Sequence, residues 1–77
     1  MNANVDIAAA ALERARQLAA AGRGEEALPE YNRVLAAQPE HAEALAFLGS
    51  REMALGRTQT AIDYLRRAAR SSPDEAQ

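Results

Sequence analysis

Apolar residues recur every three or four positions in four stretches of the chain, which is the spacing of one face of an amphipathic helix. The pattern predicts helices over residues 4–21, 25–37, 39 or 40–55, and 58–71. β-branched residues are scarce and no segment alternates cleanly with a period of two, so strands are not expected. The pattern therefore predicts an all-α chain of four helices, with short turns that make neighbouring helices antiparallel.

The predicted buried faces are rich in alanine, which suits helices that approach one another closely. The residues expected to face inward are Ala8, Ala11, Leu12, Ala15 and Leu18 in the first helix; Ala27, Leu28, Tyr31, Val34 and Leu35 in the second; Ala44, Leu45, Leu48 and Gly49 in the third; and Ala61, Ile62, Leu65, Ala68 and Ala69 in the fourth.

Glycine and proline set the predicted helix ends. Gly22 and Gly56 are expected to end the first and third helices, because glycine adopts the left-handed conformation without steric cost. Pro39 ends the second helix and can open the third at its first position. Pro29 lies inside the second helix and lacks an N–H group, so a slightly late or kinked start to that helix is expected rather than a break.

The two halves of the chain repeat in one register, with a constant offset between matching positions. The identical residues at this offset include the pairs Gly22 and Gly56, Arg23 and Arg57, Ala27 and Ala61, Arg33 and Arg67, and Pro39 and Pro73. A repeat of roughly 34 residues made of two helices resembles the tetratricopeptide repeat (TPR). The resemblance covers residues 8–41 as repeat one and 42–75 as repeat two. It implies a single TPR domain over residues 1–77, a fragment of a right-handed α-solenoid built from two helical hairpins.

Some positions depart from the family pattern. Ala11 and Arg14 stand in repeat one where the family usually has a large aromatic residue and leucine, and Glu52 stands in repeat two where a large apolar residue is usual. These departures affect how tightly the first helix of each repeat packs.

The resemblance implies a protein-interaction module or scaffold that binds a peptide or a partner domain in a concave groove lined by the first helix of each repeat. The matching positions are Ala9, Leu12, Arg16, Ala19 and Ala20 in repeat one and Glu43, Ala46, Ser50, Met53 and Ala54 in repeat two. The clamp of Lys, Asn and Arg side chains by which some relatives hold a C-terminal carboxylate is absent. An equally weighted alternative is that Leu12 and Met53 pack against neighbouring helices and bind no ligand.

The remaining residues offer little chemistry. His41 is the only histidine and there is no cysteine, so a metal site, a cofactor or a nucleophile–base pair is not expected; His41 is predicted to be an exposed turn residue. The net charge of −2 argues against nucleic acid as a partner. Arg66, Arg67 and Arg70 are interpreted as cations favoured in the last turns of a helix, with a patch for an acidic partner or a phosphate as the alternative.

No signal or membrane-spanning pattern is found at the N-terminus, so a cytoplasmic protein that does not contact membrane is expected. The acidic pairs at 25–26 and 74–75 fit helix N-termini, and residues 72–75 have the pattern of a capping box that would begin a further helix over 73–77. Such a start favours a module from a longer protein, or one that forms a homo-oligomer through its exposed repeat ends. An accessory domain of a larger enzyme and a self-associating structural module are the alternative functions.

Overall fold

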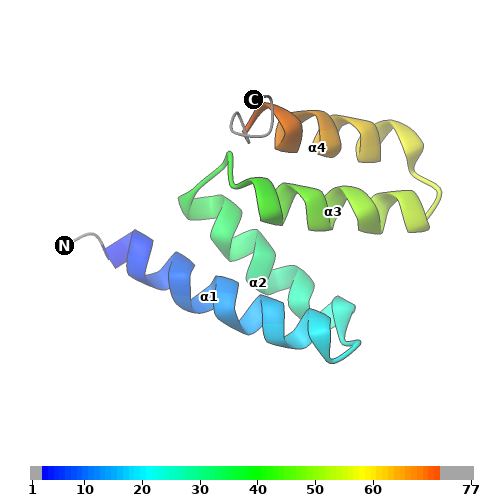
Figure 1. Cartoon of the computed structure of the whole chain (residues 1–77). Helices are drawn as coiled ribbons and strands as arrows, with labels where there is room; N and C mark the ends of the chain where they lie inside the picture. Colours follow the sequence, from blue (N-terminus) through cyan, green and yellow to red (C-terminus); the bar gives the residue numbers. More distant parts are fainter. Residues whose placement is uncertain (1–2, 72–77) are drawn as a thin grey trace. The chain divides into compact units, whose positions relative to one another are not determined.

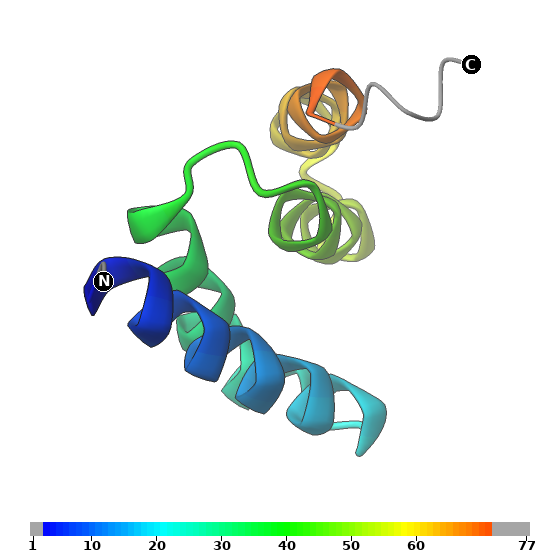
Figure 2. The ribbon, with the colours of Figure 1, turned by 60° about the vertical axis from the view of Figure 1, so that its left-hand side comes forward.

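A computed structural model describes residues 3–71 of the chain. It contains four helices, α1 (Ala3–Ala20), α2 (Gly24–Ala37), α3 (Ala42–Ala54) and α4 (Thr58–Arg70), and no strand within the described residues. Helix α1 runs alongside α2, and α3 alongside α4, as both views show (Figures 1 and 2). The chain divides into two compact units, residues 1–39 and 40–77, which are described separately below. The prediction of an all-α chain of helical hairpins is confirmed.

The turn inside each hairpin has the same hydrogen-bonded geometry. Gly22 has a φ of 78° and Gly56 a φ of 79°, in the left-handed region that favours glycine. The Gly22 N–H donates to the Ala19 carbonyl at 3.1 Å and the Arg23 N–H to the Leu18 carbonyl at 2.8 Å. The bonds at Gly56 and Arg57 repeat this arrangement at 3.0 and 2.8 Å. Both turns are therefore Schellman motifs, which satisfy the last carbonyls of α1 and α3.

The core of the first hairpin is made of small residues around one aromatic ring. Its buried members are Ala8, Ala11 and Ala15 on α1 and Ala27, Tyr31 and Val34 on α2. The leucines that were predicted to be buried, at positions 12, 18, 28 and 35, are only half-buried. They lie beside the α1–α2 interface, because the alanines between them already bring the two helices together.

The core of the second hairpin contains two leucines, and a glycine lies at its helix contact. Leu45 is fully buried, with Ala44, Leu48, Ala61 and Ala68 beside it. A Cβ atom added to Gly49 would lie 2.7 Å from Cγ of Leu65, so the glycine lets the leucine side chain lie directly on α3.

Three residues of α4 are less buried than expected. Ile62 is half-buried, Leu65 is 37% exposed although it contacts Gly49 of α3, and Ala69 is exposed, so the prediction that all three are buried is wrong. One side of the Leu65 side chain lies on Gly49, and the other side is left uncovered. Ala69 follows the buried Ala68 by one position, a rotation of roughly 100° that turns it away from α3.

Helix α3 starts later than the sequence predicted. It begins at Ala42 rather than at Pro39 or Glu40, because His41 is its N-cap: the Ala44 N–H donates to Nδ1 of His41 at 3.3 Å. His41 is half-buried, so its prediction as an exposed turn residue is also wrong. A side chain that accepts this bond satisfies one of the four N–H groups left without a partner at the start of a helix.

Helix α2 starts one residue earlier than predicted, at Gly24, and continues through Pro29. The expected late start is wrong and the expected continuity is confirmed. The backbone N–H groups of Glu26 and Ala27 both donate to the Arg23 carbonyl at 3.1 Å, so the first turn closes before the proline is reached. The predicted capping box at residues 72–75 and the further helix over 73–77 lie outside the described residues.

Candidate interaction surfaces

The groove positions of the first hairpin lie on a face of α1 beside its buried stripe. Ala8, Ala11 and Ala15 form the stripe that packs in the hairpin core. The predicted groove residues are Ala9, Leu12, Arg16, Ala19 and Ala20; Leu12 and Ala19 are half-buried and the others are exposed. The first four recur at intervals of three or four residues, and Ala20 lies four residues after Arg16, so they form one continuous strip along α1.

The equivalent strip of the second hairpin lies on α3. Its residues are Glu43, Ala46, Ser50, Met53 and Ala54, of which Glu43 and Ala46 are half-buried and the others exposed. Met53 is 46% exposed and is the largest apolar side chain of the strip. The two hairpins are separate units, so each strip belongs to one hairpin.

The charged residues outside these strips mostly stabilise helix ends. Glu25 and Glu26 lie in the first turn of α2, as predicted, where negative charge interacts favourably with the helix dipole. Glu26 accepts hydrogen bonds from Nε and Nη2 of Arg23, both at 2.6 Å. The hydrogen bond from Arg23 lowers the pKa of Glu26, and the same bond raises the pKa of Arg23. The pair closes the first turn of α2 on the protein surface.

The predicted basic cluster does not form one patch of equivalent side chains. Arg66 and Arg70 are exposed, whereas Arg67 is half-buried, with its guanidinium carbon 5.9 Å from the centre of the Tyr64 ring. That distance is within the range of a cation–π interaction. Arg67 and Arg70 occupy the last turn of α4, as the interpretation in terms of the helix dipole predicted.

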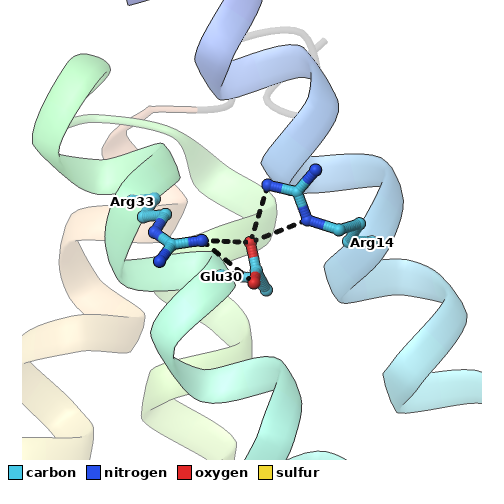
Figure 3. Close-up of polar contacts among 3 residues, drawn as sticks. All are labelled: Arg14, Glu30 and Arg33. Atoms are coloured by element: carbon cyan, nitrogen blue, oxygen red, sulfur yellow. Dashed lines mark hydrogen bonds and ion pairs between the residues drawn. The ribbon is translucent and has the colours of Figure 1, made fainter.

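Two polar clusters were not found by sequence reasoning. Glu30 of α2 forms ion pairs with Arg14 of α1 and with Arg33 of α2 (Figure 3). Glu52 of α3, which is 9% exposed, pairs with Arg57 at 3.4 Å and has an Nη1 atom of Arg51 at 3.8 Å. Arg14 and Glu52 were the departures from the repeat pattern, so an unusual charge at a core position was the signal that could have led to both clusters.

A metal site is not evident in the part of the chain that the structure describes. Within residues 3–71 no group of three or more His, Cys, Asp and Glu side chains is arranged to hold a metal ion. Across the same residues every buried side-chain nitrogen and oxygen atom has a hydrogen-bond partner. No helix within them is long and apolar enough to cross a membrane.

Comparison with known proteins gives a single match. The sequence pattern of the tetratricopeptide repeat matches residues 12–76, which is most of the chain. No curated protein and no solved structure matches. The match covers the second half of α1 and all of α2, α3 and α4, and it includes both turns, at Gly22 and Gly56, which occupy the same place in the repeat. The chain belongs to the tetratricopeptide repeat family.

Proposed function

We propose that this chain binds a peptide or a partner domain through the strips on α1 and α3. Tetratricopeptide repeats are generally protein-interaction modules, typically without catalytic activity. The observation that carries the proposal is that both strips lie outside the hairpin cores at equivalent repeat positions, and that Met53 is 46% exposed in one of them.

The chemistry of the strips favours an amphipathic helix or an extended segment with small apolar side chains. Ala9, Ala19, Ala46 and Ala54 leave room for a backbone to approach closely, and methionine adapts its shape to different apolar partners. The positions that clamp a C-terminal carboxylate in some relatives are Leu12, Arg16, Ala46 and Ser50 here. A single arginine does not make such a clamp, so recognition of a free C-terminus is not part of the proposal.

The test is a pull-down with mass spectrometry, followed by an affinity measurement with the partner identified. Met53→Asp and Arg16→Glu change the two strips, and both are expected to weaken binding at least about tenfold. Leu55→Asp is the matched control, because Leu55 is 50% exposed at the end of the same helix but lies outside the strip. Binding that survives both strip substitutions, or that is lost equally in the control, would show that the strips are the wrong surface.

Self-association is a second candidate, favoured by the exposed apolar edge of α4. Leu65 is 37% exposed and the half-buried Ile62 lies one turn before it on the same face. Light scattering over a concentration series tests this candidate, and Leu65→Glu is expected to keep the chain monomeric. A wild-type chain that stays monomeric at the highest concentrations would exclude it.

A further inference from the structure

The first hairpin carries a cluster in which one carboxylate holds two arginines. Oε1 of Glu30 accepts hydrogen bonds from Nε of Arg14 and Nη1 of Arg33, both at 3.2 Å, and Nη2 of Arg14 lies 3.2 Å from the same atom. Oε2 of Glu30 accepts from Nη1 of Arg33 at 3.1 Å. Figure 3 shows the carboxylate between the two guanidinium groups, one from α1 and one from α2.

This cluster has one positive charge more than its carboxylate neutralises. The side chain of Glu30 is 14% exposed, whereas those of Arg14 and Arg33 are 51% and 58% exposed. The bonds to Glu30 do not involve Nη1 of Arg14 or Nε and Nη2 of Arg33. Guanidinium groups bind carboxylates through paired N–H donors, and Glu30 already restricts both side chains. The cost of ordering them around a further carboxylate is therefore reduced.

A shallow apolar hollow lies at each end of this cluster. One hollow of about 320 Å³ is lined by Ile7 of α1 and by Arg33, Ala36 and Ala37 of α2. Ile7 is 55% exposed, so more than half of its side chain is available for contact with a partner.

The other hollow, also about 320 Å³, adjoins the turn of the hairpin. It is lined by Arg14, Gln17, Leu18, Ala21 and Arg23. Arg14 therefore belongs both to this hollow and to the cluster, as Arg33 belongs to the first hollow and to the cluster. The hollows and the cluster form one continuous surface.

We call this region the seam surface and define it by Ile7, Arg14 and Leu18 on α1 and by Glu30, Arg33 and Ala37 on α2. The intervals of seven and four residues on α1, and of three and four on α2, place each set on one face of its helix. Each residue turns a helix by roughly 100°. Arg14 of the seam surface and Arg16 of the groove strip therefore point in nearly opposite directions, and the two surfaces are separate.

We propose that the seam surface is a second docking site, which binds a helical segment of a partner protein with one acidic residue between two apolar residues. The acidic side chain meets Arg14 and Arg33, and the apolar side chains enter the two hollows. Ile7 and Leu18 are eleven residues apart on α1, roughly 16 Å along its axis. A partner helix lying along the seam surface would therefore carry its two apolar residues about eleven positions apart, with the acidic residue midway.

This proposal does not depend on the groove strips, and it fits the charges of the molecule. The whole chain has a net charge of −2, so an extended polyanion such as nucleic acid is disfavoured, whereas one carboxylate complements a local charge of +1. The apolar hollows on both sides favour a peptide over a free anion, since an anion alone would leave them uncovered.

The experiment uses the full chain labelled for NMR and three synthetic helical peptides, each about five helical turns long. The first peptide has leucines eleven positions apart with a glutamate midway; the second has glutamine in its place, and the third lysine. We expect saturable shifts of the Arg14 and Arg33 side-chain Nε–H signals and of the Ile7 and Leu18 methyl groups with the first peptide. We expect at least about tenfold weaker binding of the glutamine peptide, and no binding of the lysine peptide.

Protein variants complete the test. Arg33→Gln removes the surplus charge but leaves the pair between Arg14 and Glu30. It is therefore expected to weaken binding of the glutamate peptide at least about tenfold. Arg70→Gln is the matched control on α4 and is expected to have no effect, with circular dichroism checking the fold of both. Equal binding of the glutamate and glutamine peptides, shifts confined to Ala9 and Ala19, or the same Arg14 and Arg33 shifts with inorganic phosphate alone would each overturn the proposal.

Discussion

The two hairpins share their backbone geometry but differ in the chemistry that joins their helices. Arg14, Glu30 and Arg33 of the first hairpin correspond, one repeat later, to Leu48, Tyr64 and Arg67. The first set is an ion-paired cluster, and in the second set Leu48 is 5% exposed and Arg67 lies over the Tyr64 ring.

The reverse exchange occurs nearer the turn. Leu18 of the first hairpin corresponds to Glu52 of the second, which pairs with Arg57. Each hairpin thus has an arginine–glutamate pair at a place where the other has an apolar residue. The comparison indicates that the Schellman turns and the small core residues define the hairpin, while the contacts along its edges can be polar or apolar.

The largest loss of stability is expected at the core position where the side chains of the two hairpins differ most in volume. Leu45 is fully buried, and its counterpart Ala11 is also fully buried. Leu45→Ala gives the second hairpin the residue of the first. It should lower the free energy of unfolding by about 2–5 kcal/mol, because the lost methyl groups leave a cavity that the structure fills only partly.

Urea unfolding followed by circular dichroism measures this loss, and amide hydrogen exchange shows which hairpin opens. Leu55→Ala is the control, because Leu55 is half exposed and its truncation should change stability by no more than about 0.5 kcal/mol. Equal losses in the two variants would mean that Leu45 is not the centre of the second core.

The next effect concerns the close approach at Gly49, whose counterpart is Ala15. A Cβ at Gly49 would lie 2.7 and 2.8 Å from Cγ and Cδ2 of Leu65, and 3.3 Å from Cβ of Tyr64. Gly49→Ala should destabilise the chain by about 1 kcal/mol, since overpacking outweighs the gain in helix propensity. In a Leu65→Ala background the same substitution should stabilise, because the clashing side chain is gone.

Thermal or urea unfolding of the wild-type chain, the two single variants and the double variant measures both effects. It shows whether Gly49→Ala destabilises the wild-type chain and whether it stabilises the Leu65→Ala chain. The reciprocal change Ala15→Gly should cost about 1 kcal/mol through lost helix propensity. If Gly49→Ala already stabilises the wild-type chain, the leucine moves aside freely, and the small residue at 49 does not determine the spacing of α3 and α4.

A smaller effect on stability is expected when the ion pair between α1 and α2 is replaced by the corresponding residues of the second hairpin. Arg14→Leu and Glu30→Tyr each install the residue of the second hairpin. Arg14→Leu leaves Glu30 with Arg33 as its only partner in the cluster, Glu30→Tyr leaves both arginines without their carboxylate, and the double variant restores a matched pair. The coupling between the two changes should be favourable by about 0.5–1 kcal/mol, a modest value because Arg14 is half exposed. Unfolding measured in low and in high salt tests this, since salt should weaken the wild-type pair but not the double variant.

The backbone of this fold could be predicted from the sequence, whereas its polar contacts could not. The register of the repeat located Gly22 and Gly56, and the helices they end, because glycine adopts the left-handed conformation of both turns without steric cost. Helical periodicity identified the buried alanines but overestimated the burial of Leu65. Periodicity gives the direction in which a side chain points and not which neighbours cover it. The pairing of Arg14 with Glu30 joins residues 16 positions apart, and no local pattern specifies such a contact.

The start of α3 shows the same limit at a helix end. Pro39 is common at the first position of helices, yet His41 accepts the capping hydrogen bond and places the start three residues later. Histidine is not among the preferred N-cap residues, so a prediction from residue preferences selected the proline.

The smallest expected effect is a difference between the two hairpins in how the stability of one helix start depends on pH. Glu26 closes the first turn of α2, and its counterpart in α4 is Thr60, which cannot ionise. The hydrogen bond from Arg23 lowers the pKa of Glu26 in the folded chain. The resulting stabilisation is present above the unfolded pKa of about 4.3 and is lost as the pH falls through the lower folded value.

Amide exchange at the start of α2 should therefore accelerate below about pH 4 relative to the start of α4. Glu26→Gln should abolish that difference between the helices. If acid accelerates amide exchange equally at the starts of α2 and α4, the effect belongs to the chain as a whole and not to Glu26. Both side chains of the pair are more than half exposed, so the change should remain confined to the first turn of α2 and leave global unfolding unaltered.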